Sequence, residues 1–187
     1  MKNLTTAALG PVTAADFKQS IHMLEIETDD DALIDALIAS AVAVVDTATA
    51  HPYAAADYLF DLPIGGWRRW WFPVRPVNSV SKVEWMDIDG TWHGTDAGGA
   101  YVLQGHDEPQ LIVPADLSAQ LRCAQGARVT ANAGGDPTEN HRQAVIMTVK
   151  EWRDAGIALE GVEPAKVSFH VGALINQVRY KRPQIFG

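Results

Sequence analysis

The feature that most constrains the fold is a stretch of 22 residues with few polar side chains. Residues 29–50 read DDDALIDALIASAVAVVDTATA. The three aspartates stand where a helix N-terminus favours negative charge, because its first turn carries unpaired N–H groups. Behind them an apolar residue recurs every fourth position, which predicts one buried helix face. We therefore expect a central helix over about 30–50, whose core and oligomer contacts are Leu33, Leu37, Ala41 and Val45.

This expected helix carries more apolar residues than one face needs. Ile34, Ile38, Val42 and Val44 widen the apolar surface until little polar surface is left. A helix that is apolar nearly all round has to be covered on more than one side. At about 20 residues it would be roughly 30 Å long. We expect its own chain to cover one side and a neighbouring copy to cover another.

Length and composition fit one soluble domain. The 187 residues, 47% hydrophobic and 20% charged, allow a substantial core. We find no uncharged apolar run long enough for a membrane span and no signal-peptide pattern at the N-terminus. The single Cys123 excludes an internal disulfide, and we expect it to be a buried, inert thiol. These features predict a protein made in the cytoplasm.

Charge is distributed unevenly along the chain. The formal net charge is −8, and residues 13–61 hold ten acids against one lysine. Residues 164–187 hold no acid and four basic residues. An acidic body argues against a surface that grips DNA phosphates. An acidic body with a basic tail suits a subunit that assembles head to tail.

Two further helices have clear start signals. Thr13 and Asp16 form an approximate capping box for a helix over about 14–24. The sequence DPTE at 136–139 opens a helix over about 138–155 with a cap and a proline at its first position. Residues 167–178 fit both a helix and a strand. Ser168 as a cap favours the helix.

Between these helices the pattern changes to short β-type runs. Residues 55–133 are rich in Pro, Gly and aromatic residues and predict five to seven strands. Asp89-Gly90 between two runs predicts a hairpin, because the turn requires positive φ. The expected fold class is α+β: a small helical bundle of two N-terminal and one or two C-terminal helices, with a β-rich insertion and an extended tail over 179–187. We expect these parts to form one domain over 1–187.

No arrangement of residues predicts catalysis. The sequence has no Gly-rich phosphate loop, no nucleophile elbow and no paired-His helix motif. The six histidines are scattered without ligand spacing, and His22 and His51 flank helices as surface or capping groups. We therefore predict no catalytic residue, no metal site, no cofactor and no enzymatic activity.

The run WRRWWF at 67–72 is the most unusual local feature. Strand alternation would place one set of aromatic residues in a core with arginines at its margin. Alternatively, the run makes protein–protein contacts, because Trp and Arg are enriched at interface hot spots. Stacking on single-stranded nucleic acid is the least favoured reading. The candidate interface aromatics are Trp67, Trp70, Trp71 and Phe72.

The basic C-terminal tail also has two readings. Terminal residues are usually disordered, yet Ile185-Phe186 is costly to leave in water. The tail could instead dock on a partner, for example by adding a strand to a sheet edge. The residues of this hypothesis are Arg179, Lys181, Arg182, Ile185 and Phe186.

The succession of motifs resembles a known family. A short capped helix is followed by DDDALIDALIASA at 29–41 and FPVRPVNSVSKV at 72–83. The Asp89-Gly90 turn, GARVTANAGG at 126–135 and a helix ending in EWR at 151–153 complete the order. This order resembles the head–tail connector (adaptor) proteins of long-tailed bacteriophages and gene transfer agents. The match covers most of the chain, and its specificity lies in the succession of individually degenerate motifs.

Two parts of the sequence depart from that resemblance. Residues 48–52 read ATAHP where the family has a Thr-Gly-Arg-like helix end. The Trp cluster and the C-terminal RPQIFG have no counterpart that we can map. These departures leave the partner contacts open.

The resemblance implies a structural role in a particle. Its expectation is a dodecameric ring beneath the portal protein, joining the DNA-filled head to the tail and continuing the DNA channel. The implied partners are other copies, the portal, the next neck or tail-completion protein, and double-stranded DNA that passes without sequence-specific binding; no membrane is involved. The implied location is the neck of a virion or virus-like particle assembled in the bacterial cytoplasm. Alternatives are a neck stopper or tail-completion protein, or, from another class, a small Trp-rich ligand-binding domain.

Overall fold

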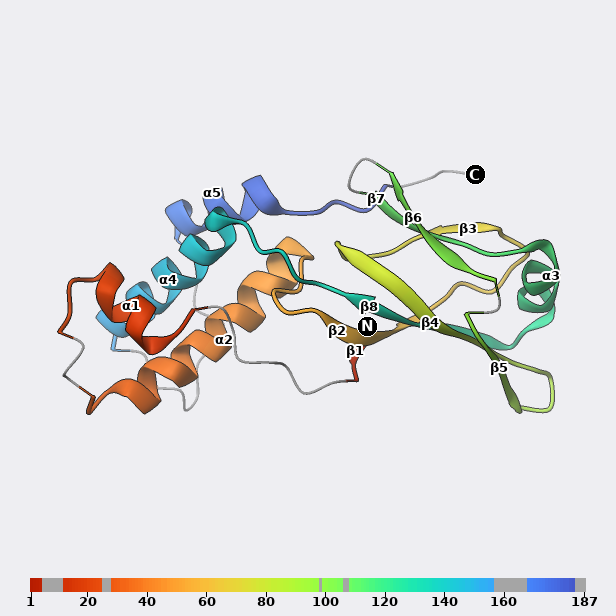
Figure 1. The fold of residues 1–187 in the computed structure, drawn as a ribbon, viewed down its shortest axis with the longest axis horizontal. Coiled ribbons are helices and arrows are strands. Elements are labelled where there is room, and N and C mark those ends of the chain that lie inside the picture. Colours follow the sequence, from red (N-terminus) through yellow and green to blue (C-terminus); the bar gives the residue numbers. More distant parts are fainter. Residues whose placement is uncertain (5–11, 25–27, 98, 106–107, 157–167, 184–187) are drawn as a thin grey trace. The chain divides into compact units, whose positions relative to one another are not determined.

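The chain divides into two compact units. A computed structural model describes residues 1–4, 12–24, 28–97, 99–105, 108–156 and 168–183 (Figure 1). Unit 1 comprises residues 1–7, 55–135 and 181–187, and unit 2 comprises 8–54 and 136–180. Helices dominate unit 2 and strands dominate unit 1, so the expected α+β class is confirmed. The assignment of one domain to the whole chain stays a prediction.

Unit 2 is a bundle around one long helix. Helix α2 (Asp31–Thr49) packs against α1 (Ala14–Ser20), α4 (Glu139–Asp154) and α5 (Phe169–Val178). Their apolar faces share one core, and Figure 1 shows α4 alongside α2. This core includes Phe17, Ile34, Leu37, Val45, Val145, Val149 and Val171.

Helix α1 starts as the sequence predicts and ends earlier. Thr13 Oγ1 accepts the Asp16 backbone N–H at 3.1 Å, and the Asp16 carboxylate accepts the Thr13 N–H at 2.9 Å. This capping box is therefore confirmed. The helix ends at Ser20 and not at about residue 24, because His22 takes a positive φ of 57° that a right-handed helix cannot continue through.

The aspartates at the start of α2 do not act as the expected caps. Asp30 is the N-cap residue in a helical conformation, and its side chain makes no capping hydrogen bond. Instead, its carboxylate lies 3.4 Å from the Arg153 guanidinium of α4. Asp31 forms an ion pair with the buried Lys18 of α1. The acidic N-terminus thus links α2 to two other helices of the bundle.

Helix α5 resolves the ambiguity between helix and strand over residues 168–178; Val167 lies outside the described residues. Ser168 is its N-cap residue, and Ser168 Oγ accepts the Val171 N–H at 3.3 Å. Val171, Ile175 and Val178 face the core, as helical spacing requires. The chain then returns to α2, where the Tyr180 N–H donates to the Thr49 carbonyl at 2.8 Å.

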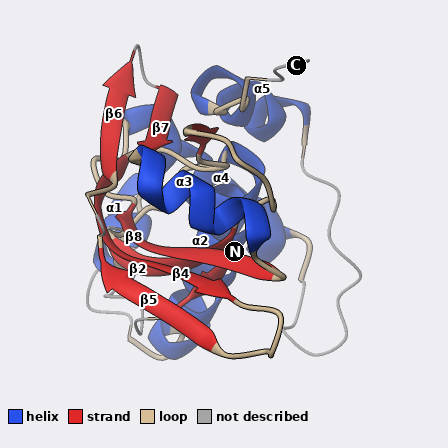
Figure 2. Ribbon diagram, turned by 90° about the vertical axis from the view of Figure 1, so that its right-hand side faces the viewer, coloured by secondary structure: helices blue, strands red, loops and turns tan. Residues whose placement is uncertain are grey.

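The described residues of unit 1 form two antiparallel sheets and one helix. The five-stranded sheet has the order β1 (Lys2–Asn3), β2 (Ala56–Asp61), β8 (Gly126–Ala133), β4 (Val77–Met86) and β5 (Trp92–Asp96). The three-stranded sheet has the order β3 (Arg69–Trp71), β7 (Glu108–Ile112) and β6 (Tyr101–Gly105). Helix α3 (Ala115–Cys123) lies across one end of the sheets (Figures 1 and 2). Both sheets and α3 contribute to one core.

Helix α3 is an element that the β-type reading of residues 55–133 missed. Leu117 and Leu121 lie one helical turn apart and are buried in the core of unit 1. Cys123 at the end of this helix is exposed, so the expectation of a buried thiol is wrong.

The predicted hairpin at Asp89-Gly90 is confirmed. It joins β4 to β5, and Gly90 takes a φ of 80°. Asp87 Oδ1 accepts the backbone N–H groups of Asp89 and Thr91, each at 3.0 Å. The turn residues therefore fix a hairpin, as their turn chemistry indicates.

Candidate interaction surfaces

The buried face of α2 contains three of the four residues expected there. Leu37, Ala41 and Val45 are buried in the core of unit 2. Leu33 is 44% exposed, so its placement in the core of the subunit is wrong. The reason is geometric: each fourth residue advances about 40° around a helix of 3.6 residues per turn, so a row of four spans about 120°. Leu33 lies at the edge of that row and points away from the core.

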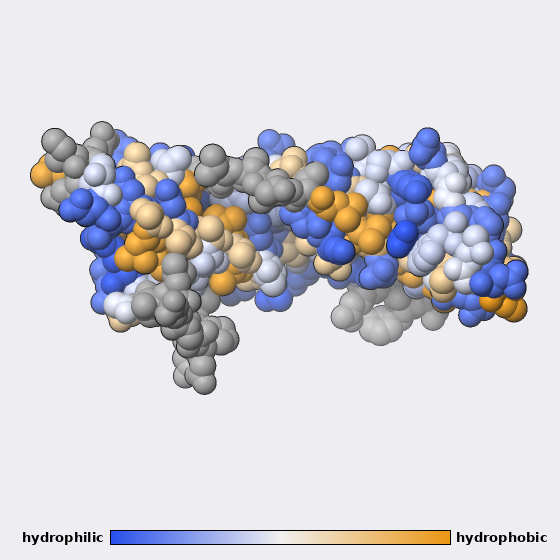
Figure 3. Space-filling model, turned by 90° about the horizontal axis from the view of Figure 1, so that it is seen from below, coloured by the Kyte–Doolittle hydropathy of each residue, from blue (hydrophilic) through white to orange (hydrophobic). Residues whose placement is uncertain are grey.

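The opposite side of α2 carries almost no charge. We call it the α2 outer face. Two large apolar side chains lie on it, Leu33 and Val44, and they are 44% and 37% exposed. Figure 3 shows hydrophobic patches on the side of unit 2 where α2 lies. The α2 outer face consists of Leu33, Ala36, Ala39, Ser40, Ala43, Val44 and Thr47.

The two hydroxyl groups of the α2 outer face are already satisfied. Ser40 Oγ donates to the Ala36 carbonyl at 3.0 Å, and Thr47 Oγ1 donates to the Ala43 carbonyl at 2.8 Å. An apolar partner could therefore cover this face without leaving a buried hydroxyl donor unpaired. These contacts make the face suitable for packing against another helix.

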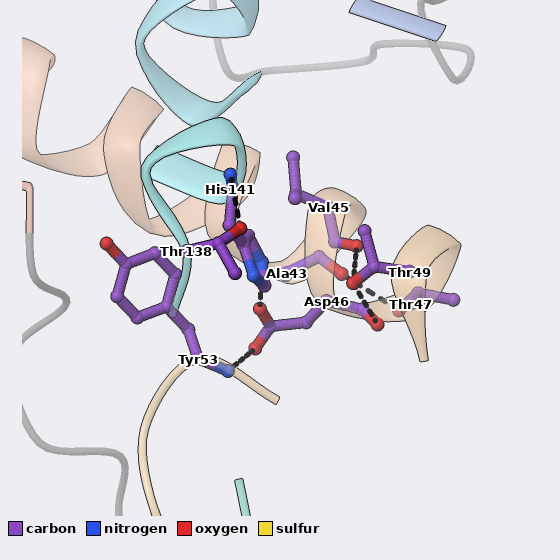
Figure 4. Close-up of polar contacts among 8 residues, drawn as sticks. All are labelled: Ala43, Val45, Asp46, Thr47, Thr49, Tyr53, Thr138 and His141. Atoms are coloured by element: carbon purple, nitrogen blue, oxygen red, sulfur yellow. Dashed lines mark hydrogen bonds and ion pairs between the residues drawn. The ribbon is translucent and has the colours of Figure 1, made fainter. Parts of the chain in front are cut away.

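A buried polar cluster fixes the C-terminal part of α2 within the bundle (Figure 4). Asp46 Oδ2 accepts the Tyr53 backbone N–H at 3.0 Å, and Asp46 Oδ1 lies 3.4 Å from His141 Nε2 of α4. The rings of His51 and Tyr53 pack on His141 with centroid distances of 5.2 and 4.9 Å. Burial raises the pKa of Tyr53 to about 12. His51 is buried here, so the expectation of a surface position is wrong.

The aromatic run of unit 1 divides between core and surface. Trp70 and Phe72 are buried, and their ring centroids lie 5.0 Å apart. Phe60 packs on both rings, at 6.4 and 5.4 Å. The core reading is therefore confirmed, and an interface role for Trp70 and Phe72 is wrong. Trp67 and Trp71 are half-buried and remain interface candidates.

The start of the basic tail packs on this aromatic core. The Arg182 guanidinium carbon lies 5.0 Å from the Trp70 ring centroid, within cation–π range. Arg179 and Lys181 are exposed. Ile185 and Phe186 lie outside the described residues, so the docking role of the tail stays a prediction.

A second exposed aromatic surface lies on the β4–β5 hairpin, which the sequence reading treated only as a turn. Ile88 at its tip is 82% exposed, and Trp92 on β5 is also exposed. The Arg128 guanidinium lies 4.0 Å from the Trp92 ring centroid and donates to Glu84 at 2.9 Å. That hydrogen bond lowers the pKa of Glu84. A tryptophan two residues after an Asp-Gly turn is the sequence signal for this surface.

The two units differ in charge. Unit 2 contains fourteen Asp and Glu residues and six Lys and Arg residues, so it carries the whole net charge of −8. Unit 1 contains nine of each and is formally neutral. Within the described part of the chain, no three His, Cys, Asp or Glu side chains come together as metal ligands.

Comparison with known proteins relates this fold to solved particle structures. No protein-family model and no curated protein matches the chain. A chain in the neck of an empty gene transfer agent (GTA) particle computed with C6 symmetry is 18% identical with a TM-score of 0.69. A chain in the virion of a native GTA particle is 20% identical with a TM-score of 0.70. A chain in the neck of a native GTA particle computed with C12 symmetry is 19% identical with a TM-score of 0.66.

These alignments extend over the full length of both proteins. Each covers 100% of this chain and 97% or 98% of the other. At such low identity the likeness shows a shared fold, in which both units are included.

Proposed function

We propose that this chain is a structural subunit of the neck of a gene transfer agent or a related phage-like particle. The observation that carries the proposal is the full-length fold match to chains from GTA necks and a GTA virion. Because both units are covered, the match does not reduce to one common supersecondary motif. The finer proposal is a head–tail adaptor that joins the DNA-filled head to the tail.

The adaptor role requires a closed ring, and the subunit has features that suit one. A heterologous contact that closes on itself generates a ring. One similar chain belongs to a neck computed with C12 symmetry, which supports a dodecamer. The α2 outer face is apolar and exposed, and its two hydroxyl groups already donate hydrogen bonds to backbone carbonyls of the same helix. We propose that this face is part of the contact between copies.

The charge of unit 2 is consistent with a DNA conduit. A net charge of −8 in that unit repels the phosphate backbone. Double-stranded DNA would therefore pass without sequence-specific binding. The further proposed partners are the portal protein on one side and the next neck or tail-completion protein on the other, with the tail from Arg179 onward as the docking element.

A neck stopper or tail-completion protein is the alternative within the same particle. The Trp-rich ligand-binding alternative has lost its main support, because Trp70 and Phe72 are core residues. No catalytic role is proposed for any residue.

Deletion of the gene in a particle-producing strain tests the adaptor role. We expect DNA-filled heads without tails in electron micrographs, and complementation in trans should restore complete particles. Heads that attach tails normally would contradict the proposal. Tailed particles whose heads have lost DNA would favour the stopper.

A further inference from the structure

We propose that the α2 outer face of one copy packs antiparallel against the exposed side of α5 in the next copy. This inference rests on the proposed ring and names the two surfaces that close it. The contact joins two different faces of unit 2, so it is heterologous, as a ring larger than a dimer requires.

Charge complementarity points to α5 as the occupant of the α2 outer face. Helix α2 contains three aspartates and no Lys or Arg, and Asp35 at its flank is exposed. Helix α5 contains no acid, and exposed Arg179 is its C-cap residue. Helices α1 and α4 each carry both signs of charge. Exposed Asp35 beside α2 and exposed Arg179 at the end of α5 therefore offer one pair of opposite charges between these two helices.

The sizes of the side chains also fit. Phe169 at the start of α5 is 86% exposed, which is unusual for a large aromatic residue. The exposed side of α5 continues with Ala173 and Asn176, one and two turns further. The α2 outer face offers small residues, among them Ala39 and Ala43, which allow a helix to approach closely.

Antiparallel packing satisfies both features at once. Ten residues of helix separate Phe169 from Arg179, a span of about 15 Å. Asp35 and Ala43 lie about 12 Å apart on the same side of α2. When Arg179 lies beside Asp35, Phe169 therefore lies close to the small side chain of Ala43. A parallel arrangement would place Arg179 at the end of α2 distant from Asp35.

A contact between two copies of α2 is less favourable. Each copy would bring its exposed Asp35 to the flank of the contact, and α2 has no Lys or Arg to compensate it. Such a symmetric contact would also stop at a dimer.

Cysteine cross-linking in assembled particles tests the pairing. The background is Cys123→Ser, because the native thiol is exposed. Ala39→Cys and Ala173→Cys are introduced singly and together, and purified particles are treated with a short bismaleimide. The control pair combines Ala39→Cys with Ala119→Cys, which lies on the exposed side of α3 in unit 1.

We expect the double variant to give a ladder of cross-linked multimers, because each copy links to the next. Each single variant and the control pair should stay monomeric on a denaturing gel. Dimers from Ala39→Cys alone would overturn the inference in favour of a symmetric contact. Particles that contain the chain but give no ladder would overturn the inference and leave the proposed function standing. Absence of the chain from purified particles would overturn the proposed function itself.

Charge exchange provides a second readout. Asp35→Arg and Arg179→Asp should each reduce the yield of tailed particles, and the double exchange should restore it. Because both side chains are exposed, neither variant should change the folded subunit. Additive losses in the double variant would contradict the pairing.

Discussion

His141 Nε2 lies 3.4 Å from Asp46 Oδ1, and the His141 side chain is completely buried. The same carboxylate accepts the Tyr53 backbone N–H at 3.0 Å. Asp46 therefore joins the end of α2 to both the following loop and the start of α4.

Replacing Asp46 tests that relationship. Asp46→Ala should lower the free energy of unfolding by about 1–3 kcal/mol, because it removes the acceptor of the Tyr53 N–H and the carboxylate beside the buried His141 ring. Asp46→Asn, which keeps one acceptor oxygen, should cost less. Urea denaturation measures both, and Asp35→Ala on the exposed flank is the control, with a change within about 0.5 kcal/mol. Equal losses in the free energy of unfolding for Asp35→Ala and Asp46→Ala would contradict the role assigned to Asp46.

The capping box of α1 predicts a pH dependence of stability. Hydrogen bonds from the Thr13 backbone and hydroxyl, together with Arg142, lower the pKa of Asp16. A carboxyl whose pKa is lower in the folded state contributes stability above its unfolded pKa and loses it as pH falls through the folded value. Asp16→Asn should therefore lose less stability than the wild type between pH 7 and pH 3. Equal losses in urea titrations at the two pH values would show that the box contributes nothing.

Adjacent tryptophans should differ in their effect on folding. Trp70→Ala removes a ring packed between Phe60 and Phe72 and should cost about 3–5 kcal/mol. Trp71→Ala removes a half-buried ring on the opposite face of β3 and should cost clearly less. Thermal and urea unfolding give the comparison. A larger loss for Trp71→Ala would reverse the assignment of the two strand faces.

Aspartate substitutions at two leucines of α2 should distinguish a loss of folding from a loss of assembly. Leu37 is 1% exposed, and Leu37→Asp would bury an unpaired charge at a cost of several kcal/mol. Leu33→Asp places the same charge on the α2 outer face, so the subunit should fold and ring assembly should fail. Circular dichroism measures folding, and native mass spectrometry of the assembled neck measures copy number. A ring built from Leu33→Asp subunits would remove the α2 outer face from the contact.

The predictions that succeeded rest on local chemistry. The Thr13–Asp16 box, the helix after Pro137 and the Asp89-Gly90 hairpin each depend on a few adjacent residues that favour one backbone conformation. The pattern that ends at Val178 fits both a helix and a strand, and Ser168 as an N-cap residue correctly favoured the helix α5. Such signals need no knowledge of distant contacts.

The predictions that failed depend on tertiary packing. An apolar helix does not reveal which of its sides the subunit covers, and Leu33 was therefore placed on the wrong side. His51 was expected on the surface. It is buried against His141, a residue 90 positions away in the sequence, and no local pattern reveals such a contact. Helix α3 was missed because only Leu117 and Leu121 mark its short apolar side. The sequence predicted that some side of α2 would be left for another copy, but which side this is, and the surface on the β4–β5 hairpin, became visible only once exposure was known.

The central proposal is that this chain forms a ring in the neck of a particle. Electron microscopy of purified necks, with the chain labelled by a fused tag, tests it most directly. The account predicts a closed ring of twelve labelled subunits around the DNA path between head and tail, in agreement with the C12 neck that contains a similar chain. Label elsewhere on the particle, or a label that never co-purifies with particles, would contradict the account.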